Sequence, residues 1–198
     1  MMLSEVTPVP QAALPVAEFK DHLRLGTGFA DDGAQDALVE SYLRAAIGAV
    51  EGRIGKALIE RDFLLELNDW RWPDCQAFPV APVNSILSVT VKDRDGTPDV
   101  IDSARYGLER DLHRPKIVAS GALLPGIPSG GAVEVVFTAG FGPVWSDVPP
   151  DLGQAVFLLA AEYHENRHEA GTQRALPFGV MALIERWRTV RVLGGGAA

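Results

Sequence analysis

Residues 38–67 read LVESYLRAAIGAVEGRIGKALIERDFLLEL, and the spacing of the apolar residues changes within this stretch. As far as Ile54 the apolar residues recur every three or four positions, which is typical of a helix. After Gly55 the period becomes two, from Ile59 to Leu67, which predicts a half-buried strand. A long helix followed at once by a strand of this kind predicts an α+β fold.

The composition is that of an ordinary globular protein, because 47% of the 198 residues are hydrophobic and 22% are charged. A chain of this length buries about 70% of the surface that it exposes when unfolded, so it needs no metal or cross-link to fold. Its single cysteine, Cys75, cannot form an internal disulfide, which fits a reducing compartment. The sequence has no basic leader before an apolar core and no run of about 20 apolar residues, so we expect a soluble, unexported protein without membrane contact.

Two helices are predicted before the strand. Pro15 suits the first position of a helix, and the apolar residues that follow it keep helical spacing to about Leu25. Asp31 and Asp32 are suitable N-caps for the second, longer helix, which continues to about Gly55.

Two further helices are predicted near the C-terminus. One follows Pro149 and Pro150 and carries Asp151 in its first turn, where a negative charge interacts favourably with the helix dipole. The other is short and includes Met181 and Trp187. With the long helix, these two segments predict a small helical bundle.

Between the helices, short alternating stretches predict a mostly antiparallel β sub-domain at residues 57–142. It is inserted into a helical core made of residues 14–56 and 149–190, and residues 191–198 form a C-terminal tail. The predicted strands after the first are centred on Leu87, Val89 and Val91, on Tyr106, on residues 116–118, and on Val133, Val135 and Phe137.

The helices carry more apolar surface than a single neighbour covers, and their small residues allow close approach of another helix. We therefore predict that helix faces form contacts between subunits. The residues predicted for these contacts are Tyr42, Ala46, Phe157 and Ala161. For the small residues Ala45, Ala46 and Ala49 there is a second interpretation besides contact between subunits, which is ordinary packing in the core of one subunit. We prefer this second interpretation for them.

Charge is distributed unevenly along the chain. The formal net charge is −8, yet the part from Thr172 onward carries +3, which leaves −11 on residues 1–171. Tight binding of nucleic acid depends on neutralising phosphates with Lys and Arg, so the acidic body argues against it. The basic end is either a chance feature of a solvated terminus or a docking tail for an acidic partner.

One catalytic motif is present. Residues 164–168, HENRH, match HExxH, in which two histidines on one helix face bind zinc and the glutamate activates water. Charged residues flank the motif, and Glu185 is the only downstream candidate for a third ligand, so a solvated helix end is the preferred interpretation. We predict no catalytic residue, metal or cofactor, and keep a zinc-dependent hydrolase as the alternative function.

A series of short runs resembles a known family in its order along the chain. The runs include Leu14-Pro15, Asp31-Asp32, Ala45-Ala46, Gly55-Lys56-Ala57-Leu58, Pro82-Val83, Asp95-Gly96, Ala139-Gly140-Phe141-Gly142, Val148-Pro149, Asp151-Leu152 and Gln154-Ala155-Val156. In this order the runs are similar to those of the head–tail connector, or adaptor, proteins of tailed phages, and especially of the version found in gene transfer agents.

The resemblance implies structural work without catalysis. Adaptors of this family form a twelve-subunit ring under the portal protein, extend the DNA channel, and carry the surface on which the stopper and tail assemble. The resemblance implies a place in the neck of a virion or gene-transfer-agent particle that is assembled in the bacterial cytoplasm, with DNA passing unbound. A tail-completion protein of the same neck is a third possibility.

The C-terminal segments of such adaptors reach into the portal. The run Arg186-Trp187-Arg188 keeps the aromatic and arginine residues of the family's C-terminal pattern and lacks its proline. An aromatic or arginine anchor that is buried on binding contributes about 2 kcal/mol or more. The residues predicted for portal binding are Arg186, Trp187, Arg188, Arg191, Val192 and Leu193.

Overall fold

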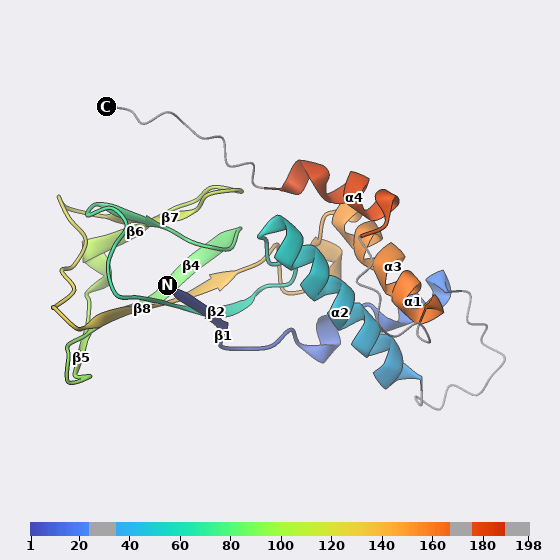
Figure 1. Ribbon diagram of the computed structural model, residues 1–198, viewed down its shortest axis with the longest axis horizontal. Coiled ribbons are helices and arrows are strands. Elements are labelled where there is room, and N and C mark those ends of the chain that lie inside the picture. The colour runs from blue at the N-terminus through green and yellow to red at the C-terminus, as the bar shows by residue number, and fades with distance from the viewer. Residues whose placement is uncertain (24–34, 167–175, 189–198) are drawn as a thin grey trace. The chain divides into compact units, whose positions relative to one another are not determined.

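The computed structural model describes residues 1–23, 35–166 and 176–188 (Figure 1). These residues form four helices and two antiparallel sheets, which confirms the predicted α+β fold. The helices are α1 (Val16–His22), α2 (Asp36–Ile54), α3 (Pro150–Glu165) and α4 (Phe178–Ile184). The strands are β1 (Met2–Glu5), β2 (Arg61–Leu67), β3 (Cys75–Ala77), β4 (Val83–Lys92), β5 (Pro98–Val100), β6 (Tyr106–Glu109), β7 (Lys116–Ala119) and β8 (Ala132–Ala139).

The chain divides into two compact units. The β unit contains residues 1–13 and 56–147, and the helical unit contains residues 14–55 and those described from 148 onward. Strands β1, β3 and β5 lack a counterpart among the predicted strands. They are only three or four residues long, and β1 and β5 are exposed throughout, so no apolar alternation marks them.

Five strands make the larger sheet of the β unit, in the order β1-β2-β8-β4-β5. In β2 every second side chain is buried, as the period of two predicts. Phe63 of β2 lies opposite Phe137 of β8, and their rings stack with centroids 5.7 Å apart. These two rings lie in the apolar core of the unit.

The prediction for β4 is wrong at one residue. Alternation placed Leu87 on the same face as Val89 and Val91, and the latter two are buried as expected. Leu87 is 53% exposed, because the register with β8 shifts between Ile86 and Ser88. This bulge inserts Leu87 as an extra residue and turns it away from the core.

The smaller sheet has the order β3-β7-β6 and is also antiparallel. Ile117 of β7 is fully buried, and Tyr106 of β6 is 9% exposed. Both belong to the same apolar core as Phe137, so the two sheets share one core.

In the helical unit, α3 packs against both α2 and α4. The buried stripe of α3 contains Leu152, Val156 and Leu159, as its helical spacing predicts. No helix among the described residues is both long enough and apolar enough to span a membrane.

The ends of the two N-terminal helices differ from the predictions. Helix α1 ends at His22, short of Leu25, which lies outside the described residues. Helix α2 begins at Asp36 with Gln35 as its N-cap, so the prediction of an N-cap at Asp31 or Asp32 is wrong; both also lie outside the described residues. At its other end Gly55 adopts φ 68°, a left-handed conformation that glycine enters without steric cost.

Candidate assembly site

The last described residues are attached to the first turn of α3. Trp187 donates a hydrogen bond from Nε1 to Oδ2 of Asp151 over 2.6 Å. The same oxygen lies 2.7 Å from Nε of Arg186. The Arg186 guanidinium also stands over the Trp187 ring, 4.9 Å from its centroid. We call this arrangement of Asp151, Arg186 and Trp187 the Asp151 clamp.

The two contacts with Asp151 contribute differently to stability, because the residues that make them differ in exposure. The Asp151 side chain is 19% exposed, whereas that of Arg186 is 70% exposed, so water screens the ion pair between them. The bond from Trp187 is the better shielded of the two, since Trp187 is half-buried. Asp151 also lies where the partial positive charge of the α3 N-terminus favours a carboxylate.

Arg188 is also paired within the chain. Its Nη1 lies 3.0 Å from both carboxylate oxygens of Glu185, one turn earlier. Three of the six residues predicted for portal binding thus contact acidic groups of the same chain. The other three, Arg191, Val192 and Leu193, lie outside the described residues.

Two of the four residues predicted for contacts between subunits pack on rings of the helical unit. Tyr42 is half-buried and lies edge-on to the ring of His164, at a centroid distance of 5.8 Å. Phe157 packs against the rings of Phe19 and His22, each at 5.5 Å.

The other two residues predicted for these contacts are alanines. Ala46 has no exposed surface, so it belongs to the core of the helical unit, and we do not keep the subunit contact predicted for it. This is the core packing that was the alternative interpretation. Ala161 is half-buried on α3.

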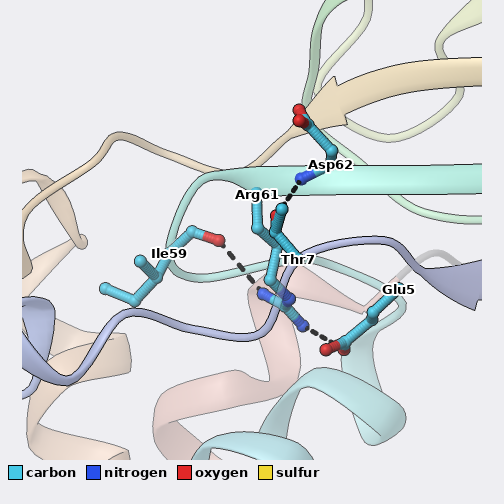
Figure 2. A network of polar contacts seen from close by, with 5 residues as sticks. All are labelled: Glu5, Thr7, Ile59, Arg61 and Asp62. Atoms are coloured by element: carbon cyan, nitrogen blue, oxygen red, sulfur yellow. Dashed lines mark hydrogen bonds and ion pairs between the residues drawn. The ribbon is translucent and has the colours of Figure 1, made fainter.

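A site that sequence reasoning missed lies where β1 joins the β unit (Figure 2). The Arg61 side chain, only 4% exposed, pairs with Glu5 of β1 at 2.7 Å and donates to the Ile59 carbonyl at 3.0 Å. The backbone N–H of Asp62 donates to the Thr7 hydroxyl at 3.0 Å. The contacts with Glu5 and Thr7 join residues 56 and 55 positions apart, so no local pattern could reveal them.

Three solved structures are similar to the chain over almost its whole length. One is the neck of an empty GTA particle computed with C6 symmetry, with 62% identity, a TM-score of 0.89, and coverage of 98% of this chain and 99% of that one. The chain belongs to the head–tail connector family of gene transfer agents. The virion of a native gene transfer agent particle holds a second such chain, 62% identical with a TM-score of 0.87. The neck of a native GTA particle computed with C12 symmetry holds a third, 56% identical with a TM-score of 0.85.

Both of these further matches again cover 98% of the connector and 99% of the matched chain. No protein-family model matches the sequence, and no curated protein matches it significantly.

In the connector, the first half of the HExxH motif lies on the last turn of α3. His164 packs against Tyr42, and Glu165 is exposed. Arg167 and His168 lie outside the described residues. Among the residues that are described, no three His, Cys, Asp or Glu side chains are grouped as a metal site would require. The relatives are components of particles, which favours a structural role over hydrolysis.

The β unit of the connector also contains a buried lysine. Lys56 has no exposed surface, donates to the Leu112 carbonyl at 2.5 Å, and lies 3.2 Å from Nδ1 of His113. Burial lowers the pKa of Lys56, and the nearby negative charge of Asp111 opposes that shift. Backbone N–H groups of His113 and Arg114 donate to Asp111 and lower the pKa of its carboxyl group. Lys56 therefore anchors the loop at residues 111–114 within the β unit.

Proposed function

We propose that the connector is a structural subunit of the neck of a gene-transfer-agent particle, where identical copies form a ring between the portal and the stopper or tail. The observation that carries this proposal is the 62% identity to a chain in such a neck, over 98% of the connector. The related necks were computed with C6 and C12 symmetry, which supports a ring of twelve copies. Assembly in the bacterial cytoplasm is part of the same proposal.

The charge of the connector suits a channel through which DNA moves. Residues 1–171 carry a formal charge of −11, so this part of the protein repels the phosphate backbone. A ring of such subunits encloses DNA without holding it. We therefore propose that DNA passes through the channel without specific binding.

We propose that the portal is contacted by the tail beyond the Asp151 clamp. Arg186 and Trp187 are engaged with Asp151, and Arg188 with Glu185, in the same chain. Their role in this proposal is to fix the point from which the tail leaves the helical unit. Arg191, Val192 and Leu193 then supply the cationic and apolar groups that bind the portal.

Two truncations test this division of roles. Removal of residues 189–198 leaves the clamp whole, and we expect a folded protein that does not join portal-containing particles. Removal of residues 186–198 also deletes the clamp, so we expect in addition a lower melting temperature. The measurements are thermal unfolding of the purified variants and immunoblotting of purified particles. Normal incorporation of the shorter deletion would refute the docking role of the tail.

A further inference from the structure

Strand β1 is an exposed edge of the five-stranded sheet. Among the described residues it pairs with β2 on one side only, and all four of its residues are exposed. Met2 is 57% exposed and Leu3 is 38% exposed, and Val6 just after the strand is 54% exposed. An apolar edge strand of this kind pairs readily with another chain, so folded proteins usually shield it.

The hydrogen-bond pattern shows which backbone groups of β1 face outward. Val6 donates its N–H to the carbonyl of Asp62, across the ladder from β1 to β2. Along an antiparallel strand, the backbone N–H and C=O groups of one residue point toward the partner strand and those of the next residue point away from it. Ser4 and Met2 therefore bond to β2, whereas the N–H and C=O groups of Leu3 and Glu5 point away from the sheet.

The opposite edge of the same sheet is β5. Ile101 donates its N–H to the carbonyl of Val89, so by the same alternation the backbone groups of Pro98 and Val100 point outward. Pro98 has a carbonyl but no N–H. The Val100 side chain is 70% exposed. This edge offers two carbonyls and one N–H.

We propose that the outer edge of β1 receives β5 of the next copy, so that the sheet continues from one subunit to its neighbour around the ring. The inference rests on the proposed function, since it requires a ring. A cyclic ring needs two different, complementary surfaces on each copy, facing its two neighbours. The two ends of one sheet meet this requirement, whereas pairing of β1 with β1 would stop at a dimer.

The direction of the strands determines the bonds together with one further condition, that all three outward groups of β5 bond to residues of β1. Successive strands of the sheet are antiparallel, so β1 and β5, its first and fifth strands, run in the same direction. Copies related by a small rotation keep this direction, and the two edges therefore pair in parallel. Leu3 then donates to the Pro98 carbonyl, Val100 donates to the Leu3 carbonyl, and Glu5 donates to the Val100 carbonyl. The missing N–H of Pro98 costs nothing in this register.

This register places Ser4 beside Val100 of the neighbour, which a disulfide can test. We would combine Ser4→Cys and Val100→Cys with Cys75→Ser, since Cys75 is otherwise the single thiol. Within one chain these positions lie at opposite ends of the sheet, about 19 Å apart across four strand spacings, which is too far for a disulfide. Oxidised particles should give a ladder of covalent multimers beyond the dimer on a non-reducing gel.

The controls identify the partner. Ser4→Cys with Leu87→Cys uses another exposed apolar position, on β4, and should give no ladder. A dimer formed by Ser4→Cys alone would indicate β1 against β1 and overturn the proposal, as would a disulfide to a different neck protein. The proposal is also overturned if the variant with Ser4→Cys and Val100→Cys is incorporated normally and gives no ladder. Absence of the wild-type chain from particle necks would refute the proposed function instead.

A proline variant gives a second measurement. Leu3→Pro removes an N–H that points away from β2, so the isolated protein should keep its melting temperature. We expect at least a tenfold loss of incorporation into particles. Equal incorporation of Leu3→Pro and wild type would overturn the proposal. Ser4→Pro removes a bond to β2 and should lower the melting temperature as well. It is the control for disruption of the pairing between β1 and β2.

Discussion

Trp187 donates a hydrogen bond to Asp151 over 2.6 Å, and this contact ties the last described residues to the first turn of α3. In the sequence Trp187 has the features of an anchor that inserts into a partner. In the folded chain its indole N–H is already engaged. In the proposed function, Trp187 therefore holds the base of the tail, and the residues beyond it bind the portal.

Replacement of Asp151 tests the clamp. Asp151→Ala removes the acceptor shared by Trp187 and Arg186, and we expect the free energy of unfolding to fall by about 1–2 kcal/mol. Glu185→Ala is the matched control, because the Glu185 side chain is 59% exposed, against 19% for Asp151, so loss of its ion pair with Arg188 should matter by less than about 0.5 kcal/mol. Urea unfolding of both variants measures the difference. Equal effects would show that the clamp adds nothing to stability.

Gly140 is required by a close approach of two backbone segments. Its φ is +141°, and a Cβ atom there would lie 2.4 Å from both N and Cα of Glu60. We expect Gly140→Ala to destabilise the connector by about 3 kcal/mol, since backbone atoms have to move. Gly48→Ala on the exposed face of α2 meets nothing within 4 Å and should instead stabilise it by about 0.5–1 kcal/mol. Thermal unfolding distinguishes these outcomes, and similar melting temperatures would contradict the close approach.

Lys56 makes stability depend on pH. Its pKa is lowered in the folded chain, so between that lowered pKa and 10.5 the unfolded chain binds more protons than the folded one. The free energy of unfolding therefore rises with pH in this window. In Lys56→Met the contribution disappears, and the slope of stability from about pH 8 to 10 should be smaller than in wild type. Parallel urea-unfolding series at several pH values measure both slopes, and identical slopes would mean that Lys56 titrates normally.

Loss of the charge on Glu5 should weaken the attachment of β1. The Arg61 side chain is 4% exposed and the Glu5 side chain is 48% exposed, so the pair is shielded from one side only. We expect Glu5→Gln to lower the free energy of unfolding by about 1–2 kcal/mol, less than for a fully buried pair. Glu109→Gln serves as the control, because its pair with Lys116 is exposed on both sides. A similar cost for both variants would show that burial of Arg61 is unimportant.

Much of the fold could be predicted because its elements have strong periodic patterns. The buried stripe of α3 and the alternation of β2 follow directly from the spacing of apolar residues. Leu87 was misplaced because a bulge depends on how β4 aligns with β8, which the spacing within β4 does not encode. Strand β1 was missed because its pairing with β2 joins distant parts of the chain.

The candidate site was only partly predictable for the same reason. Charge counting identified the basic C-terminal segment from Thr172 onward, but it did not show that Arg186 and Trp187 contact Asp151. Contacts of this kind depend on which surfaces the fold brings together.

By itself the sequence determined the α+β class, the helix and strand periods, the acidic body with its basic end, and the family resemblance. These properties depend on residue order and composition. The helix and strand periods follow from local backbone geometry, which sets the direction of successive side chains. The tertiary structure alone decided that Asp151 holds Trp187, that Arg61 is buried against Glu5, and that β1 is the first strand of the five-stranded sheet. Each of these results depends on packing between segments that are far apart in the chain, and no local pattern encodes it.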